Sequence, residues 1–143
     1  MKIALAADHG GFERKEFIAG YLEALGHTIL DLGCKTTDSV DYPDFAHALA
    51  QAITDGLAEL GFAFCGSANG ISIALNRHHG VRAALCWLPE IATLARQHNN
   101  ANVCSMPGRF IDNTQAAAIA DAFLEAQYEG GRHETRVQKI EIL

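Results

Sequence analysis

Short apolar runs alternate with longer amphipathic segments along the whole of this chain. Residues 2–7 are typical of a buried strand, and residues 12–25 carry apolar side chains at helical spacing. The same succession predicts strands at 27–32, 61–65, 81–86 and 101–105, and helices at 43–57, 69–76, 89–97 and 113–127. This order predicts a single-domain Rossmann-like three-layer α/β/α sandwich with a five-stranded parallel sheet.

The length and composition fit one domain. The chain has 143 residues, of which 49% are apolar, enough for a hydrophobic core. We expect one domain over residues 1–143, with an α/β core over 1–127 and a C-terminal tail over 128–143. The tail follows a break at Gly130 and Gly131, begins as a helix, and is expected to contribute to a subunit interface.

Charge and cysteine content exclude several classes of protein. A formal net charge of -6 argues against a general nucleic-acid-binding protein. No run resembles a signal-peptide core or a membrane span, so we expect a cytoplasmic protein without membrane association. The four cysteines form no closely spaced pair, and no set of ligand residues has metal-site spacing. We therefore expect no disulfide framework, no metal and no cofactor.

A cysteine followed by a loop of small residues is the main chemical feature. Cys65 ends the apolar run 61–65, and Gly66 and Gly70 bound the loop that leads into the next helix. Unpartnered N–H groups at a helix start favour anions and stabilise a thiolate, so Cys65 is a potential base or nucleophile. Its position is also consistent with a buried core cysteine. Ala68 carries a Cβ atom and is not expected to adopt a left-handed backbone conformation.

Other polar groups fall where ligands bind in this class of fold. Asp8 and His9 follow the first strand and Arg109 follows the fifth, so both segments lie with the Cys65 loop at the carboxyl end of the sheet. His98 falls at the opposite pole, which is consistent with a site at a subunit interface. Asp8 as a helix cap and His98 as a charge at a helix end are the structural alternatives.

Two arginines in the tail point to an anion. Arg132 and Arg136 are four residues apart and share a helix face, where like charges repel unless an anion lies between them. The alternative is a solvated pair. His133, like His78 and His79, is expected to lie in a solvent-exposed segment.

Several motifs in order resemble the ribose-5-phosphate isomerase B family over nearly the whole chain. They include Ala-Asp-His-Gly-Gly-Phe at 7–12 and Tyr-Glu-Gly-Gly-Arg-His at 128–133, and they extend to residues 41–44, 65–67, 70–71, 96–99 and 101–103. The resemblance implies a metal-free aldose–ketose isomerase that interconverts ribose 5-phosphate and ribulose 5-phosphate through an enediolate. It also implies a homodimer, or a dimer of dimers, with the site at the subunit interface.

The resemblance also assigns roles to residues. Cys65 would be the base and His98 would open the sugar ring. The substrate-binding set that it implies is Asp8, His9, Gly66, Ser67, Ala68, Asn69, Gly70, Asn99, Arg109, Arg132 and Arg136.

The loop after Cys65 combines features of two subtypes of this family. Ile71 stands where other members carry a glutamate base, which places this chain with the cysteine type, whereas Asn69 is typical of the glutamate type. A six-carbon substrate, allose 6-phosphate or galactose 6-phosphate, is therefore an alternative. A non-catalytic flavodoxin-like sensor of a phosphate ligand and a redox-sensing thiol are alternatives of other classes.

Overall fold

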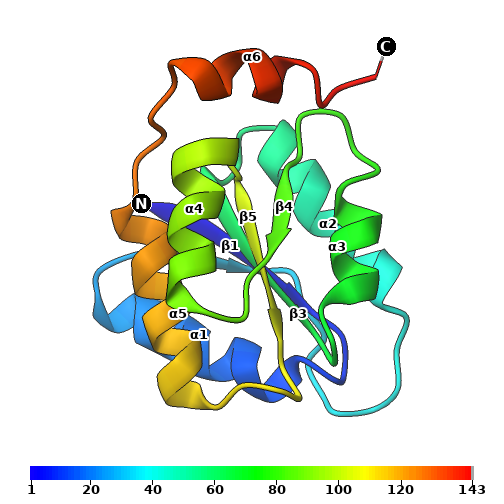
Figure 1. The fold of residues 1–143 in the computed structure, drawn as a ribbon. Helices are drawn as coiled ribbons and strands as arrows, with labels where there is room; N and C mark the ends of the chain where they lie inside the picture. Colours follow the sequence, from blue (N-terminus) through cyan, green and yellow to red (C-terminus); the bar gives the residue numbers. More distant parts are fainter. Residues whose placement is uncertain (143) are drawn as a thin grey trace.

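The computed structural model describes residues 1–142, which form a parallel sheet covered by helices (Figure 1). In spatial order the strands are β2 (Thr28–Asp31), β1 (Lys2–Ala7), β3 (Leu60–Cys65), β5 (Val103–Pro107) and β4 (Ala83–Leu85). The helices are α1 (Phe12–Ala24), α2 (Tyr42–Thr54), α3 (Asn69–Leu75), α4 (Pro89–Asn99), α5 (Asn113–Glu125) and α6 (Arg132–Gln138). Within residues 1–142, no helix is long and apolar enough to cross a membrane.

Alternating side chains of the strands point into two separate hydrophobic clusters. Ile3 and Leu5 of β1 pack in the cluster that includes buried residues of α1, α4 and α5. Ala4 and Ala6 belong to the other cluster, which includes buried residues of α2 and α3. Because successive residues of a strand face opposite sides, one buried strand supplies both layers. The expected Rossmann-like three-layer arrangement is confirmed.

The register of the strands brings three loops to one edge of the sheet. Ala7 of β1 pairs with Phe64 of β3, and Cys65 pairs with Pro107 of β5. The carboxyl ends of these three parallel strands are therefore level with one another. The loops that follow these three strands therefore begin side by side, at the edge where ligands bind in open α/β sheets.

The C-terminal helix α6 lies over the opposite pole of the molecule, next to the end of α4 (Figure 1). The Glu129 N–H donates a hydrogen bond to the Gln97 carbonyl (3.0 Å), which joins the segment before α6 to α4. Since α4 leads back to the start of β5, its last turn lies at the amino end of the sheet. The tail therefore lies at the pole remote from the Cys65 loop of its own chain.

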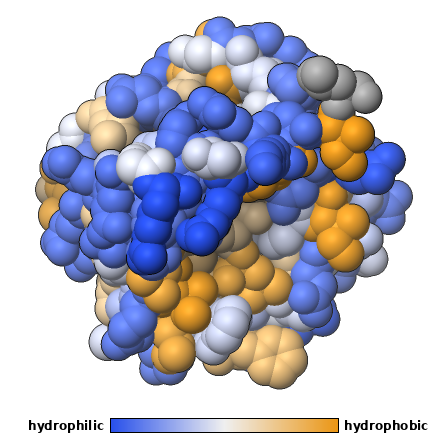
Figure 2. Space-filling view, turned by 45° about the horizontal axis from the view of Figure 1, so that its top comes forward, coloured by the Kyte–Doolittle hydropathy of each residue, from blue (hydrophilic) through white to orange (hydrophobic). Residues whose placement is uncertain are grey.

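An apolar surface surrounds β4, which is an edge strand of the sheet. Figure 2 shows hydrophobic side chains gathered below the hydrophilic surface of α6. Ile73 of α3 is 67% exposed, and Trp87 and Leu88, which follow β4, are 50% and 46% exposed. An unpaired strand edge flanked by exposed apolar groups is typical of a surface that another chain covers.

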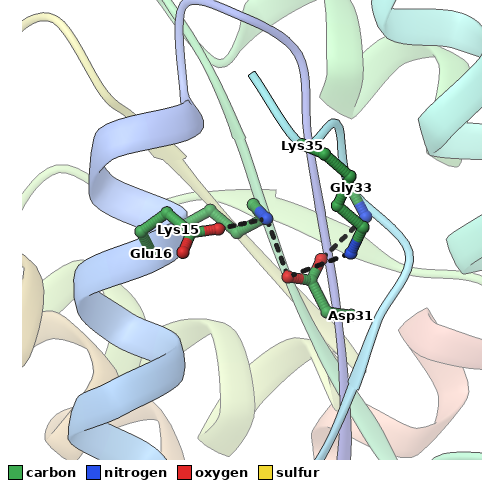
Figure 3. Close-up of polar contacts among 5 residues, drawn as sticks. All are labelled: Lys15, Glu16, Asp31, Gly33 and Lys35. Atoms are coloured by element: carbon green, nitrogen blue, oxygen red, sulfur yellow. Dashed lines mark hydrogen bonds and ion pairs between the residues drawn. The ribbon is translucent and has the colours of Figure 1, made fainter. Parts of the chain in front are cut away.

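A buried ion pair links α1 to the end of β2 (Figure 3). The fully buried Lys15 donates from Nζ to Asp31 Oδ2 (2.7 Å) and Glu16 Oε1 (2.8 Å). Asp31 Oδ1 accepts from the Gly33 N–H (2.9 Å). Burial alone would raise the pKa of Asp31, but its bonds from Lys15 and Gly33 and the charges of Lys15 and Lys35 outweigh burial and lower that pKa.

We expect Asp31→Asn to lower the free energy of unfolding at pH 7 by about 3 kcal/mol, because it deprives the buried Lys15 of its closest anion. The pKa of Asp31 is lowered in the folded state, so its contribution is present above the unfolded value of roughly 3.9. That contribution is lost as the pH falls through the folded pKa. Urea denaturation should therefore show a smaller difference in the free energy of unfolding between variant and wild type in acid than at pH 7.

The control is Asp38→Asn, which removes an exposed carboxylate from the loop that follows β2. It should leave the free energy of unfolding within about 0.5 kcal/mol of wild type. An equal loss in both variants would assign the effect to net charge and not to the Lys15–Asp31 pair.

Candidate active site

Glycines allow the three loops at the carboxyl edge to touch backbone to backbone. A Cβ atom on Gly10 would lie 3.0 Å from the Gly66 nitrogen, and one on Gly108 would lie 2.9 Å from the Gly10 carbonyl oxygen. The Gly108 N–H donates to the Cys65 carbonyl (2.9 Å), and the Arg109 N–H donates to the Gly66 carbonyl (3.1 Å). Larger side chains at Gly10 or Gly108 would separate these loops, so the glycines determine the shape of the site.

Cys65 is the last residue of β3 and is buried, with 5% of its surface exposed. The loop after it turns back on itself, because the Asn69 N–H donates to the Ser67 hydroxyl oxygen (3.3 Å). The first N–H groups of α3 have no acceptor within the helix. The fold therefore places a thiol beside a loop of backbone N–H donors, an arrangement that suits proton removal next to a developing oxyanion.

Ala68 adopts the left-handed backbone conformation, with φ 67° and ψ -3°, so the expectation from its Cβ atom is wrong. The left-handed turn orients the Ala68 carbonyl toward α3, where it accepts from the Ser72 N–H (3.2 Å) and hydroxyl (2.7 Å). Ala68 is also fully buried. These contacts offset the steric cost of the conformation, which is about 1 to 2 kcal/mol.

We expect Ala68→Gly to leave the free energy of unfolding within about 0.5 kcal/mol of wild type. Glycine relieves the left-handed strain, but it loses about one buried methyl group and gains freedom in the unfolded chain. The matched control is Ala74→Gly, a buried position in the right-handed part of α3, which should cost about 1 to 2 kcal/mol. Urea denaturation of both variants measures the difference, and equal losses would contradict the strain at Ala68.

Asp8 and His9 are held by backbone groups. Asp8 is buried, and its Oδ1 accepts from the N–H groups of Gly10 (2.9 Å) and Gly11 (3.2 Å), which leaves Oδ2 for another partner. His9 Nδ1 accepts from the Val40 N–H (3.1 Å). A neutral imidazole that accepts at Nδ1 carries its proton on Nε2, so His9 presents a donor suited to an anionic oxygen.

A cavity of about 290 Å³ opens beside these loops. Three basic side chains and one acidic side chain line it together with backbone and a hydroxyl group: His9, Gly10, Glu13, Arg14, Thr37, Gly108 and Arg109. The Arg109 guanidinium also lies over Gly66, where an added Cβ atom would be 3.0 Å from its Nη1. Two arginines and a histidine outnumber the Glu13 carboxylate in this cavity, which favours an anion in a protein whose net charge is negative.

Arg14 and Tyr42 are site residues that sequence reasoning missed. Arg14 Nε donates to the Ile111 carbonyl (2.8 Å), which holds the side chain along the cavity. Its position in the first turn of the helix after Asp8-His9 was the available signal. Tyr42 lies against Gly70, where an added Cβ atom would be 2.5 Å from its ring. Tyr42 falls within the motif at 41–44, but nothing in the sequence related it to Gly70.

The remaining site residues lie at the other pole and not beside Cys65 of the same chain. His98 is in the last turn of α4, with its side chain 36% exposed. Asn99 lines a pocket of about 350 Å³ with Arg82 and Ala84, next to the β4 edge. Arg132 and Arg136 are exposed on α6. The structure thus divides the predicted residues into two groups, as the position of His98 in the sequence indicated.

His133 does not lie in a solvent-exposed segment, and this expectation is wrong. It is 6% exposed, and its ring stacks on that of His98 with centroids 4.2 Å apart. Its neighbours in sequence gave no sign of this contact, because α4 and α6 are distant in the chain. His79 is exposed as expected, whereas the half-buried His78 lies 2.7 Å from His47, Nε2 to Nδ1.

Comparison with known proteins agrees with this architecture. Residues 3–140 match the model of the family described as Ribose/Galactose Isomerase. Ribose-5-phosphate isomerase B of Escherichia coli is 42% identical over 139 residues, which cover 97% of this chain and 93% of the relative.

Solved structures are also similar over nearly their whole length. A ribose 5-phosphate isomerase from Thermotoga maritima has a TM-score of 0.96 and 48% identity, covering 97% of this chain and 96% of the other. A ribose-5-phosphate isomerase B from Mycoplasma genitalium with bound ribulose-5-phosphate has a TM-score of 0.92 and 39% identity, covering 97% and 93%. The chain therefore belongs to the Ribose/Galactose Isomerase family and is an isomerase.

Proposed function

We propose that this isomerase interconverts ribose 5-phosphate and ribulose 5-phosphate through an enediolate, with Cys65 as the base. The observation that carries the proposal is the position of the thiol, at the end of β3 where the three glycine-containing loops meet. Relatives named for this substrate support the choice of a five-carbon sugar phosphate.

The proposed step moves one proton between neighbouring carbons. In the open aldose the C1 carbonyl acidifies the proton on C2, which the Cys65 thiolate removes while the electron pair moves onto O1. Backbone N–H groups of residues 66–70 and the Ser67 hydroxyl stabilise the resulting enediolate. A proton then passes from O2 to O1, and the thiol, whose proton exchanges with solvent, protonates C1, which leaves a carbonyl at C2.

The cavity beside the loops provides contacts for the rest of the substrate. His9 and Arg109, which line it, donate to phosphate oxygens, and Arg14 adds positive charge. Asp8 Oδ2 and Asn69 contact sugar hydroxyl groups. Binding energy from the phosphate, which does not react, helps to orient C1 and C2 at the thiol.

We further propose that the site is completed by a second copy of the chain, in a homodimer or a dimer of dimers. The partner's His98 protonates the ring oxygen while the anomeric hydroxyl group loses its proton to water, which opens the furanose. The partner's Asn99, the partner's Arg132 and the partner's Arg136 bind the substrate. The apolar surface around β4, with Ile73, Trp87 and Leu88, is the contact that would be buried.

Two-fold symmetry provides the geometric reason. In an isologous dimer the same surface is used by both copies. If the two-fold axis crosses the β4 edge at right angles to the strands, the two sheets run in opposite directions. The Cys65 pole of one chain then lies beside the α6 pole of the other. This arrangement joins two groups of residues that one chain keeps apart.

The test of the reaction is turnover in heavy water. Purified protein is incubated separately with ribose 5-phosphate, allose 6-phosphate and galactose 6-phosphate in D₂O, and NMR follows ketose formation and deuterium at C1 and C2. We expect conversion of ribose 5-phosphate with deuterium at these carbons. Preference for a six-carbon sugar would reassign the substrate, and hydrogen transfer from C2 to C1 with no deuterium in substrate or product after many turnovers would contradict proton transfer through the thiol.

A further inference from the structure

Three side chains of types that bind metal ions converge at the α6 pole, although one of them lies about 30 residues before the other two in the sequence. His98 lies in the last turn of α4, Glu129 precedes α6, and His133 lies in the first turn of α6. One nitrogen or oxygen atom from each lies within 4.8 Å of the other two. Sequence spacing did not predict this set of ligands. His98 meets the other two residues only through the contact between α4 and α6, which the spacing does not reveal.

The distances are close to those of a metal site. Glu129 Oε1 lies 3.4 Å from His133 Nε2 and 3.8 Å from His98 Nε2. Ligand atoms about 2.0 to 2.1 Å from a tetrahedral zinc ion are about 3.3 Å apart. The two imidazole rings are nearly parallel, at 13°, so their lone pairs run side by side. A tilt of the half-exposed His98 ring is the movement needed for both lone pairs to meet at one ion.

The surroundings limit the movement of the other two ligands. His133 is 6% exposed, and its backbone N–H donates to the Gly130 carbonyl (3.0 Å). The backbone of Glu129 is bonded to the end of α4 through Gln97. Two imidazoles and one carboxylate are a donor set that suits Zn²⁺, with a fourth position open to water.

We propose that His98, Glu129 and His133 form an inhibitory zinc site at the α6 pole. Binding of the ion occupies the Nε2 lone pair of His98, the nitrogen that faces Glu129. An imidazole held by the ion is no longer free to act as the acid that opens the sugar ring. Binding of the ion is independent of the reaction, whereas inhibition rests on the proposed role of His98 in ring opening.

Binding is tested with the metal alone, on the full-length protein freed of metal. Calorimetry with Zn²⁺ measures affinity, and Co²⁺ substitution reports the ligands by absorption. We expect one ion per chain, a tetrahedral Co²⁺ spectrum without a thiolate band, and at least about a tenfold weaker dissociation constant in Glu129→Gln and in His133→Asn.

The control is His47→Asn, which removes the other close histidine contact, between His47 and His78. Zinc affinity should not change in this variant. Loss of binding in His47→Asn would place the ion at that pair, and a Co²⁺–thiolate band that disappears in Cys65→Ala would place it at the cysteine. Either result, or equal affinity in wild type, Glu129→Gln and His133→Asn, would overturn the proposal.

Inhibition is measured separately, as turnover of ribose 5-phosphate at buffered free Zn²⁺. Wild type should lose at least about nine-tenths of its activity at a concentration tenfold above the measured dissociation constant. Glu129→Gln should need at least about tenfold more zinc for the same loss. If wild type turns over ribose 5-phosphate and zinc binds without inhibiting that turnover, the inhibitory role is wrong. If wild type does not turn over this sugar, the proposed function fails while the binding result stands.

Discussion

Replacing Cys65 by alanine is expected to lower kcat for ribose 5-phosphate by about a thousandfold, because in the proposed mechanism no other group takes the proton from C2. The thiol lies at the carboxyl end of β3 and directly precedes the loop of N–H donors. Serine should fail nearly as completely, since its hydroxyl ionises too weakly near neutral pH to replace a thiolate. Steady-state kinetics of the three purified proteins measure the effect.

The matched control is Cys86→Ala, which removes a thiol that is also buried but lies on the side of the sheet occupied by α4 and α5. This variant should retain wild-type kcat, with a loss of stability of about 1 kcal/mol from the missing buried atom. Turnover of Cys65→Ala within tenfold of wild type, in a protein with unchanged circular dichroism, would show that Cys65 is not the base.

The order of elements could be predicted because local patterns are enough to indicate it. The apolar run at residues 2–7 coincides with β1, and apolar residues at helical spacing correctly predicted α5 from residue 113. Boundaries were less accurate, since the strand expected at 101–105 is Val103–Pro107 in the structure. The strand expected at 81–86 is reduced to Ala83–Leu85, which pairs with β5 alone. The flanking residues still bond to β5, through the Arg82 carbonyl and the Cys86 N–H, but they lie outside the paired register.

Backbone conformation and long-range contacts explain what the sequence did not reveal. Ala68 is left-handed and fully buried, and its carbonyl accepts two hydrogen bonds from Ser72, one turn later. A preference based on one residue does not include these contacts. His133 is buried because α6 packs against α4, about 35 residues earlier in the chain. By contrast, the division between Cys65 and His98 follows from strand direction alone, so the sequence was sufficient to predict it.

Because Cys65 and His98 lie at opposite poles of one chain, we expect activity to return when two inactive variants are combined. Cys65→Ala and His98→Asn should each be nearly inactive as homodimers. Co-expression in equal amounts should restore activity to about a quarter of wild type. Half of the dimers are then mixed. In each mixed dimer one site combines the unsubstituted Cys65 of one chain with the unsubstituted His98 of the other, and the second site contains both substitutions. Differently tagged chains allow the mixed dimer to be purified and assayed alone.

Recovery of about a quarter of the wild-type activity distinguishes a shared site from a site within one chain. If Cys65 and His98 acted in the same chain, every site in the mixture would lack one of them and no activity would return. The control combines His98→Asn with the double variant Cys65→Ala/His98→Asn, in which no pairing supplies an unsubstituted His98, so the mixture should stay inactive. An inactive mixture of the single variants, with mixed dimers present by mass, would return His98 to a role within its own chain and remove the reason for pairing the two poles across β4.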